Sequence, residues 1–175
     1  MFLTNDKVVL SSIILTTVAA GVLLWRRRAG GRAFGAAMPV AFTGVTLTLM
    51  MAAHCVEIGY RVAGGVVDGM PPLRYDFRAY SLQLLGVLMM WLGVRAVIAA
   101  GGIARGEAGA RGAAFRPMLG VLALSAPIIP IHPFFGPLGT GLALIGLAGV
   151  ALAPRVPPPA RTPAATGQET AGALA

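Results

Sequence analysis

Residues 34–61 read FGAAMPVAFTGVTLTLMMAAHCVEIGYR, an apolar run that closes on several of the few ionisable side chains in the chain. The part from Phe34 to Val56 is long enough, at about 1.5 Å per residue, to cross the hydrocarbon core of a bilayer as a helix. His54, Glu57 and Arg61 follow at the i, i+3 and i+7 positions of one helical face. The stretch therefore predicts a membrane-spanning helix that ends in a polar cluster.

The composition also favours a membrane protein. Of the 175 residues, 57% are hydrophobic and 11% are charged, and the mean hydropathy is +0.79. The 14 basic and 6 acidic side chains are too few to cover the surface of a soluble domain of this size. Lipid needs no such surface, so an integral membrane protein is predicted. Cys55 is the single cysteine, which excludes an intrachain disulfide.

Four other apolar runs predict further spans at residues 8–25, 79–100, 118–131 and 138–153. With 34–56 they predict an all-α, polytopic integral membrane bundle of about five transmembrane helices, formed by residues 1–153 as a single domain. The prolines between the last two runs break the helix, and we expect a turn at 132–137. Four spans result instead if 117–153 forms a re-entrant hairpin or one broken span. Residues 154–175, rich in proline and alanine, are expected to form a disordered cytoplasmic tail.

Small residues recur on the apolar runs at spacings that place them on shared helical faces. They are Gly44, Thr48 and Ala52 on the second run, Gly86 and Gly93 on the third, and the pairs Gly139 with Ala143 and Gly141 with Gly149 on the last. Such stripes allow the backbones of two membrane helices to approach closely. We therefore expect tight helix contacts, with a partner or with copies of the chain.

The arginines predict an orientation in the membrane. In the five-span arrangement nine of them fall on one side, several in a basic loop at 103–116: Arg26, Arg27, Arg28, Arg32, Arg105, Arg111, Arg116, Arg155 and Arg161. The other side holds four basic residues: Lys7, Arg61, Arg74 and Arg78. Because basic loops stay in the cytoplasm, we expect an outer N-terminus and a cytoplasmic C-terminus in a bacterial plasma membrane. The basic residues form no stripe with interleaved aromatics, so nucleic acid is not an expected partner.

The outer face is expected to gather a polar cluster of His54, Glu57, Arg61, Asp76 and Arg78. A carboxylate at headgroup depth needs a partner, and Arg61 stands at the favourable i+4 position from Glu57. The simplest interpretation is a self-neutralised set of ion pairs that fixes the end of the second span to the following loop and the next span.

The small-residue stripes outnumber the chemical motifs, which favours a non-catalytic accessory or assembly subunit that acts through helix packing. Motifs such as His-x-Glu-x-x-His and Gly-x-Ser-x-Gly are absent from the sequence, so an enzyme is not favoured. A small oligomeric transporter is an alternative, because a proline-broken span and Gln83 could expose polar groups to a substrate.

A second alternative is a haem- or quinone-binding membrane anchor of an electron-transfer complex. His54 and His132 are expected at similar depth near the outer side, and two histidines on different helices can ligate the iron of haem b. A copper site is a third hypothesis, because thioether, thiolate and imidazole groups suit the cuprous ion. Its possible ligands are His54, Cys55, Met50, Met51, Met89 and Met90.

Overall fold

The computed structural model describes residues 15–22, 31–66, 72–73, 77–130 and 135–156. Of these residues, 87% are helical and none lies in a strand, which confirms the all-α prediction. The elements are α2 (Gly31–Val62), α3 (Phe77–Arg105), α4 (Ala110–Ser125), the short 3₁₀ helix η2 (Ala126–Ile128) and α5 (Phe135–Leu152). Residues 15–22, part of the first predicted span, are also helical.

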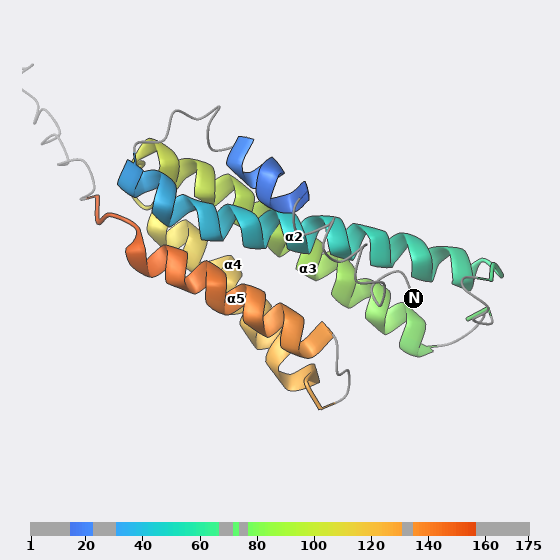
Figure 1. The fold of residues 1–175 in the computed structure, drawn as a ribbon. Coiled ribbons are helices and arrows are strands. Elements are labelled where there is room, and N and C mark those ends of the chain that lie inside the picture. The colour runs from blue at the N-terminus through green and yellow to red at the C-terminus, as the bar shows by residue number, and fades with distance from the viewer. Residues whose placement is uncertain (1–14, 23–30, 67–71, 74–76, 131–134, 157–175) are drawn as a thin grey trace, which may run out of the picture.

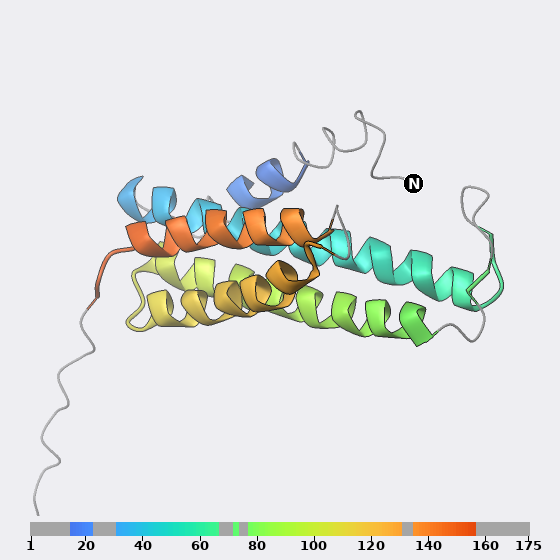
Figure 2. The ribbon, with the colours of Figure 1, turned by 90° about the horizontal axis from the view of Figure 1, so that it is seen from below.

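The four long helices form a bundle of antiparallel neighbours (Figure 1). α2 packs against α3 and α5, and α4 completes the bundle by packing against α3 and α5. The helical segment 15–22 lies beside α2, where Gly21 approaches Met38. Figure 2 shows that α2 and α3 extend well past the shorter α4–α5 pair at the end where α2 ends and α3 begins. This unequal length leaves one face of the long pair only partly covered.

Three helices are long and apolar enough to cross a membrane: α2, the Tyr80–Arg105 part of α3, and α5. Large apolar side chains also point outward from α3 at intervals of three or four residues, at Leu84, Val87, Trp91, Val94 and Ile98. An outward stripe of this kind suits lipid better than water. These observations support the membrane prediction, and the number of spans stays a prediction.

α2 and α3 touch through their backbones at two glycines. A Cβ on Gly44 would lie 2.7 Å from the carbonyl oxygen of Gly93, and a Cβ on Gly93 would lie 2.8 Å from that of Gly44. Beside them, Thr48 Oγ1 donates a 2.7 Å hydrogen bond to Gly44 O within its own helix. A Cβ on Gly86 would meet Cys55 Sγ at 2.8 Å. The predicted close-approach positions Gly44, Gly86 and Gly93 are therefore contact points between α2 and α3.

α5 also packs through small residues. A Cβ on Gly139 would lie 2.8 Å from Ser125 Cβ on α4, and one on Gly149 would lie 2.8 Å from the carbonyl oxygen of Ala36 on α2. The hydroxyl of Thr43 donates a buried 2.8 Å hydrogen bond to the carbonyl oxygen of Leu142, which adds a polar link between α2 and α5. A Cβ built on Gly141 has no described neighbour within 4 Å, so Gly141 is not a contact point between the described helices, and its contact with a partner or a second copy stays a prediction.

The helices run past the limits of the apolar segments. α2 spans Gly31–Val62 where 34–56 was predicted, and α3 spans Phe77–Arg105 where 79–100 was predicted. Each ends at a glycine in the left-handed region, Gly64 with φ 99° and Gly106 with φ 70°. At each end the next amide bonds back to the last turn, as in a Schellman motif. The end of each of these helices is thus set by a glycine cap. The end of an apolar run indicates only where the hydrocarbon core of a bilayer would end.

The predicted fourth span is displaced. It was expected at 118–131, after a basic loop at 103–116, but α4 covers Ala110–Ser125 and only residues 106–109 connect it to α3. The helix continues through Pro117. Its buried face carries Ala110, Ala114, Pro117, Met118 and Val121. α2 also begins before the predicted residue 34, at Gly31. Pro39 therefore lies about two turns inside the helix.

The predicted break between the last two spans is present. η2 and a turn at residues 129–130 follow α4, at Pro127 and Pro130. α5 begins at Phe135, three residues before the predicted 138, with Pro137 in its first turn, where a missing amide hydrogen costs least. The described residues leave out 131–134, residues 157–175 of the predicted tail, and residues 8–14 and 23–25 of the predicted first span.

Candidate functional site

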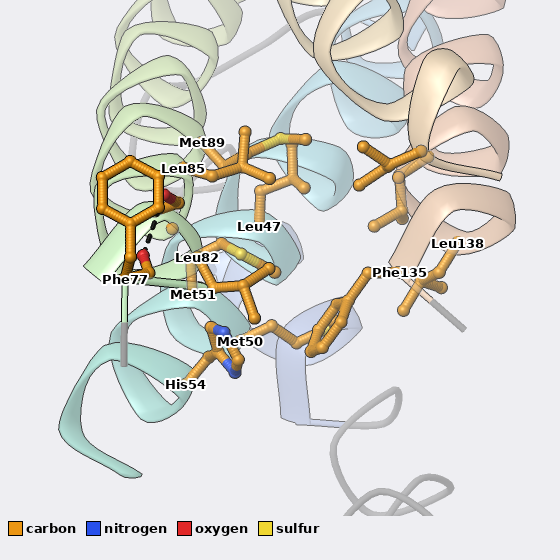
Figure 3. A pocket seen from close by; sticks show the side chains of 15 residues that line it. Leu47, Met50, Met51, His54, Phe77, Leu82, Leu85, Met89, Phe135 and Leu138 are labelled. Atoms are coloured by element: carbon orange, nitrogen blue, oxygen red, sulfur yellow. Dashed lines mark hydrogen bonds between the residues drawn. The ribbon is translucent and has the colours of Figure 1, made fainter. Parts of the chain in front are cut away.

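A partly open pocket of about 570 Å³ lies between α2, α3 and the start of α5 (Figure 3). It is lined by Leu47, Met50, Met51 and His54 of α2, Phe77, Ser81, Leu82, Leu85, Gly86 and Met89 of α3, Ile128 of η2, and Phe135, Leu138, Gly139 and Leu142 of α5. The α2 and α3 members recur every three or four residues, so each helix contributes one face. Figure 3 shows these faces opposite the side chains of α5.

The pocket exists because the two helix pairs differ in length. Beyond the start of α5 no described helix covers the inner face of α2 and α3, and Ile128 of η2 and Phe135 of α5 line the pocket at this point. Gly136 lets the start of α5 lie close to the residue after η2, since a Cβ there would lie 2.5 Å from Ile129 Cα. The side chains of Phe135 and Leu138 then form the wall opposite His54 and Leu85.

Among the described residues the lining is apolar with two polar side chains, His54 and Ser81, and it includes no Asp, Glu, Lys or Arg. The His54 ring packs on the Phe135 ring, with 4.8 Å between centroids and 59° between planes. The hydroxyl of Ser81 donates a 3.0 Å hydrogen bond to the carbonyl oxygen of Phe77, one turn earlier on the same helix. Three methionines, Met50, Met51 and Met89, contribute polarisable thioethers to the wall.

The predicted polar cluster divides into two parts. Glu57 and Arg61 form the expected i,i+4 ion pair, with 4.0 Å between Oε1 and Nη1, and neither lines the pocket. The carbonyl oxygen of Arg61 accepts a 3.0 Å hydrogen bond from the amide of Leu73, which ties the following loop to α2. His54, one turn before Glu57, belongs instead to the pocket.

The other predicted site residues are only partly described. Arg78 lies in the first turn of α3, at the same end of the bundle as Glu57 and Arg61. Asp76 and His132 lie outside the described residues, so the pairing of His54 with His132 stays a prediction.

The copper hypothesis receives partial geometric support. Met50, Met51, Met89 and His54 do face one pocket, but Cys55 and Met90 do not line it. Cys55 Sγ instead lies 3.7 Å from the carbonyl oxygen of Gln83, as its hydrogen-bond donor. In the part of the chain that the structure describes, no three His, Cys, Asp or Glu side chains are grouped to hold a metal ion.

Sequence reasoning did not find the aromatic wall of the pocket. Phe135 precedes the predicted fifth span and follows a proline-rich segment, so its spacing gave no sign that it meets His54. The three pocket methionines appear in the sequence predictions as possible copper ligands, without a pocket between them. Comparison with protein-family models, curated proteins and solved structures finds no match for this chain. The pocket is therefore interpreted from its own chemistry, which suits a small apolar ligand with one or two hydrogen-bonding groups.

Proposed function

We propose that this protein is a non-catalytic integral membrane protein whose pocket binds a neutral, lipid-soluble ligand. The observation that carries the proposal is the lining: about 570 Å³ of space, walls of leucine, methionine and phenylalanine, and two polar side chains. This volume lies within the usual range of ligand sites, about 300–1,000 Å³. A neutral ligand suits the described lining, whose side chains are apolar apart from His54 and Ser81, because burying a charge among apolar groups is costly.

The accessory-subunit hypothesis stays a prediction, and part of the small-residue stripes that favoured it is used within the chain. These stripes contact other helices of the same chain at Gly44, Gly93, Gly139 and Gly149. They therefore contribute to the packing of the bundle. Membership of a larger membrane complex and a transport role stay predictions. The haem hypothesis stays a prediction, because His132 lies outside the described residues.

A photoreactive apolar probe tests the proposed pocket. Labelling by 3-trifluoromethyl-3-phenyldiazirine in liposomes should be saturable at the peptide that contains Met50 and Met51. Leu85→Trp places a bulky ring in the pocket and should reduce this labelling at least threefold. Leu84→Trp, on the neighbouring outward-facing residue, should leave it unchanged, because Leu84 is 63% exposed and does not line the pocket. Equal labelling in both variants, read by peptide mass spectrometry, would contradict the proposal.

We also propose the five-span arrangement, with the N-terminus outside and the C-terminus in the cytoplasm of a bacterial cell. Arg32, Arg105, Arg111 and Arg155 lie at the bundle end where α2 and α4 begin and α3 and α5 end. Among the described residues there, Glu107 is the one acidic side chain, and it accepts a hydrogen bond from Arg105. The opposite end holds the balanced Glu57–Arg61 pair. This asymmetry supports a cytoplasmic basic end.

Cysteine labelling tests this orientation. In a Cys55→Ala background, Val66→Cys should react with an impermeant maleimide added to intact spheroplasts, and Val156→Cys should react only after the membrane is opened. Both native side chains are exposed, at 58% and 40%, and they lie at opposite ends of the bundle, so each controls for the other. The reverse pattern would overturn the orientation, and reaction of both from outside would exclude an odd number of crossings between them.

A further inference from the structure

We infer that the outward face of α3 around Trp91 and Arg95 binds a membrane helix of another protein, and that this helix carries a carboxylate at the depth of Arg95. The inference goes beyond the proposed ligand, because Leu85 and Met89 line the pocket from another face of the same helix. It is carried by the depth of Arg95 in the helix, the direction of its side chain and the spacing of the residues around it.

Arg95 lies well inside a helix that can cross a membrane. It follows Tyr80, the first residue of the apolar part of α3 that is long enough to span, by fifteen residues, and it precedes Arg105, the last, by ten. At about 1.5 Å per residue these separations are about 22 Å and 15 Å along the helix. A hydrocarbon core of about 30 Å placed anywhere within this part of α3 therefore encloses the backbone of Arg95.

The side chain of Arg95 is exposed, and it points away from the nearer end of α3. Its Cζ atom lies 5.7 Å from the centroid of the Trp91 ring, one turn closer to the start of the helix. An arginine that faces lipid usually extends toward the nearer headgroups, because a charge in hydrocarbon is costly. The cation–π contact with Trp91 offsets part of this cost. Charged side chains within membrane helices mostly face other helices and pair there with an opposite charge, so this arrangement indicates a helix partner.

The residues around Arg95 have the spacing of a helix-packing seam. Exposed side chains follow one another in steps of four and three residues, at Leu84, Leu88, Trp91, Arg95 and Ile98. This spacing keeps one side of a helix against a neighbouring helix over several turns. Trp91, which is 57% exposed, and Arg95 also belong to the residue types that contribute most to protein interfaces. The face therefore suits a second membrane helix.

Charge complementarity identifies the partner. A guanidinium group pairs best with a carboxylate, which can accept two hydrogen bonds from it. The apolar runs of this chain contain no Asp or Glu, at 8–25, 34–56, 79–100, 118–131 and 138–153. A second copy would therefore bring no carboxylate to this depth, and a two-fold contact along the face would place one Arg95 near the other. The carboxylate therefore comes from a helix of a different membrane protein.

Fluorescence energy transfer in phosphatidylcholine liposomes tests the inference with two synthetic membrane-spanning peptides. Each has about 20 leucine and alanine residues, and the central residue is glutamate in one peptide and glutamine in the other. The full chain carries the donor dye at Val156→Cys in a Cys55→Ala background, and the peptides carry the acceptor. We expect the chain to bind the glutamate peptide about tenfold more tightly, the effect of one charge-assisted hydrogen bond.

Three variants locate the source of this preference. Arg95→Leu should bind the two peptides equally. Arg95→Lys should keep most of the preference, because it retains the positive charge. Arg105→Gln is the matched control, since Arg105 is exposed at the last residue of α3, where it donates a hydrogen bond to Glu107. It should leave the preference unchanged.

The other possible occupants of this face give different results. Equal binding of both peptides to the unsubstituted chain, or an unchanged preference in Arg95→Leu, overturns the inference. Energy transfer between copies of the chain that Trp91→Ala abolishes would assign the face to a second copy. Loss of the preference when phosphatidylglycerol replaces part of the phosphatidylcholine would assign Arg95 to an anionic headgroup, and both of these results also overturn the inference. The comparison of the two peptides decides the question even if Arg95→Leu fails to fold.

Discussion

Gly44→Ala is expected to lower the free energy of unfolding by about 1–3 kcal/mol, the usual cost of forcing an extra group into a packed core. The new Cβ would lie 2.7 Å from Gly93 O and 2.9 Å from Val97 N. Both are backbone atoms, so no side-chain rotation can relieve the contact and α2 must move away from α3. Reversible unfolding in mixed micelles, followed by circular dichroism, measures the change.

Gly35→Ala is the matched control on the same helix. A Cβ on Gly35 has no described neighbour within 4 Å, so the substitution adds only the better helix propensity of alanine. We expect stability to stay unchanged or to rise by up to about 1 kcal/mol. If the two variants unfold alike, the α2–α3 backbone contact does not hold the bundle together, and the described packing of these helices is wrong.

Gly149→Ala should destabilise the protein by a similar amount, about 1–3 kcal/mol, at the contact between α5 and α2. Its Cβ would lie 2.8 Å from Ala36 O, 3.0 Å from Pro39 Cβ and 3.1 Å from Val40 Cγ2. The proline ring and the carbonyl cannot turn aside, so α5 has to shift along its last turns. A lower temperature of unfolding in detergent, measured by intrinsic fluorescence and light scattering, is the expected result.

Gly141→Ala provides the comparison on α5. A Cβ built on Gly141 meets no described atom within 4 Å, although the sequence pattern predicts that Gly141 shares a face with Gly149. It should therefore behave like wild type. A loss of stability in Gly141→Ala equal to that in Gly149→Ala would mean that alanine harms α5 through its lipid face and not through its contact with α2.

Much of the fold follows from hydrophobicity. The apolar runs predict the helices, and the spacing of small residues predicts faces that allow close approach. That two of these faces meet each other, with Gly44 against Gly93, is seen only in the structure. The helix limits were less accurate, since an apolar run records where hydrocarbon begins and Gly64 and Gly106 determine where the helices end. The fourth predicted span began after Pro117, but α4 begins at Ala110 and contains this proline on its buried face.

The pocket at His54 could not be predicted from the sequence. The shared face of His54, Glu57 and Arg61 suggested one polar cluster, and the Glu57–Arg61 pair is present. Whether His54 joins that pair or a pocket depends on where α5 begins, and this is a property of the assembled bundle. The contact between His54 and Phe135 joins residues about eighty positions apart, and no local pattern records it.

The unequal helix lengths also bear on the bilayer. α2 is about 48 Å long and α5 about 27 Å, against a hydrocarbon core of about 30 Å. The usual tilts, up to about 40°, absorb only part of the excess of α2, so a bilayer of this thickness would leave part of α2 outside the hydrocarbon core. α5 has no such reserve, and Phe135 and Leu138 in its first turn line the pocket. If the pocket binds a ligand as proposed, hydrophobic mismatch in a thicker or thinner bilayer would act first on the pocket's rim, and membrane thickness would change the rate of ligand exchange.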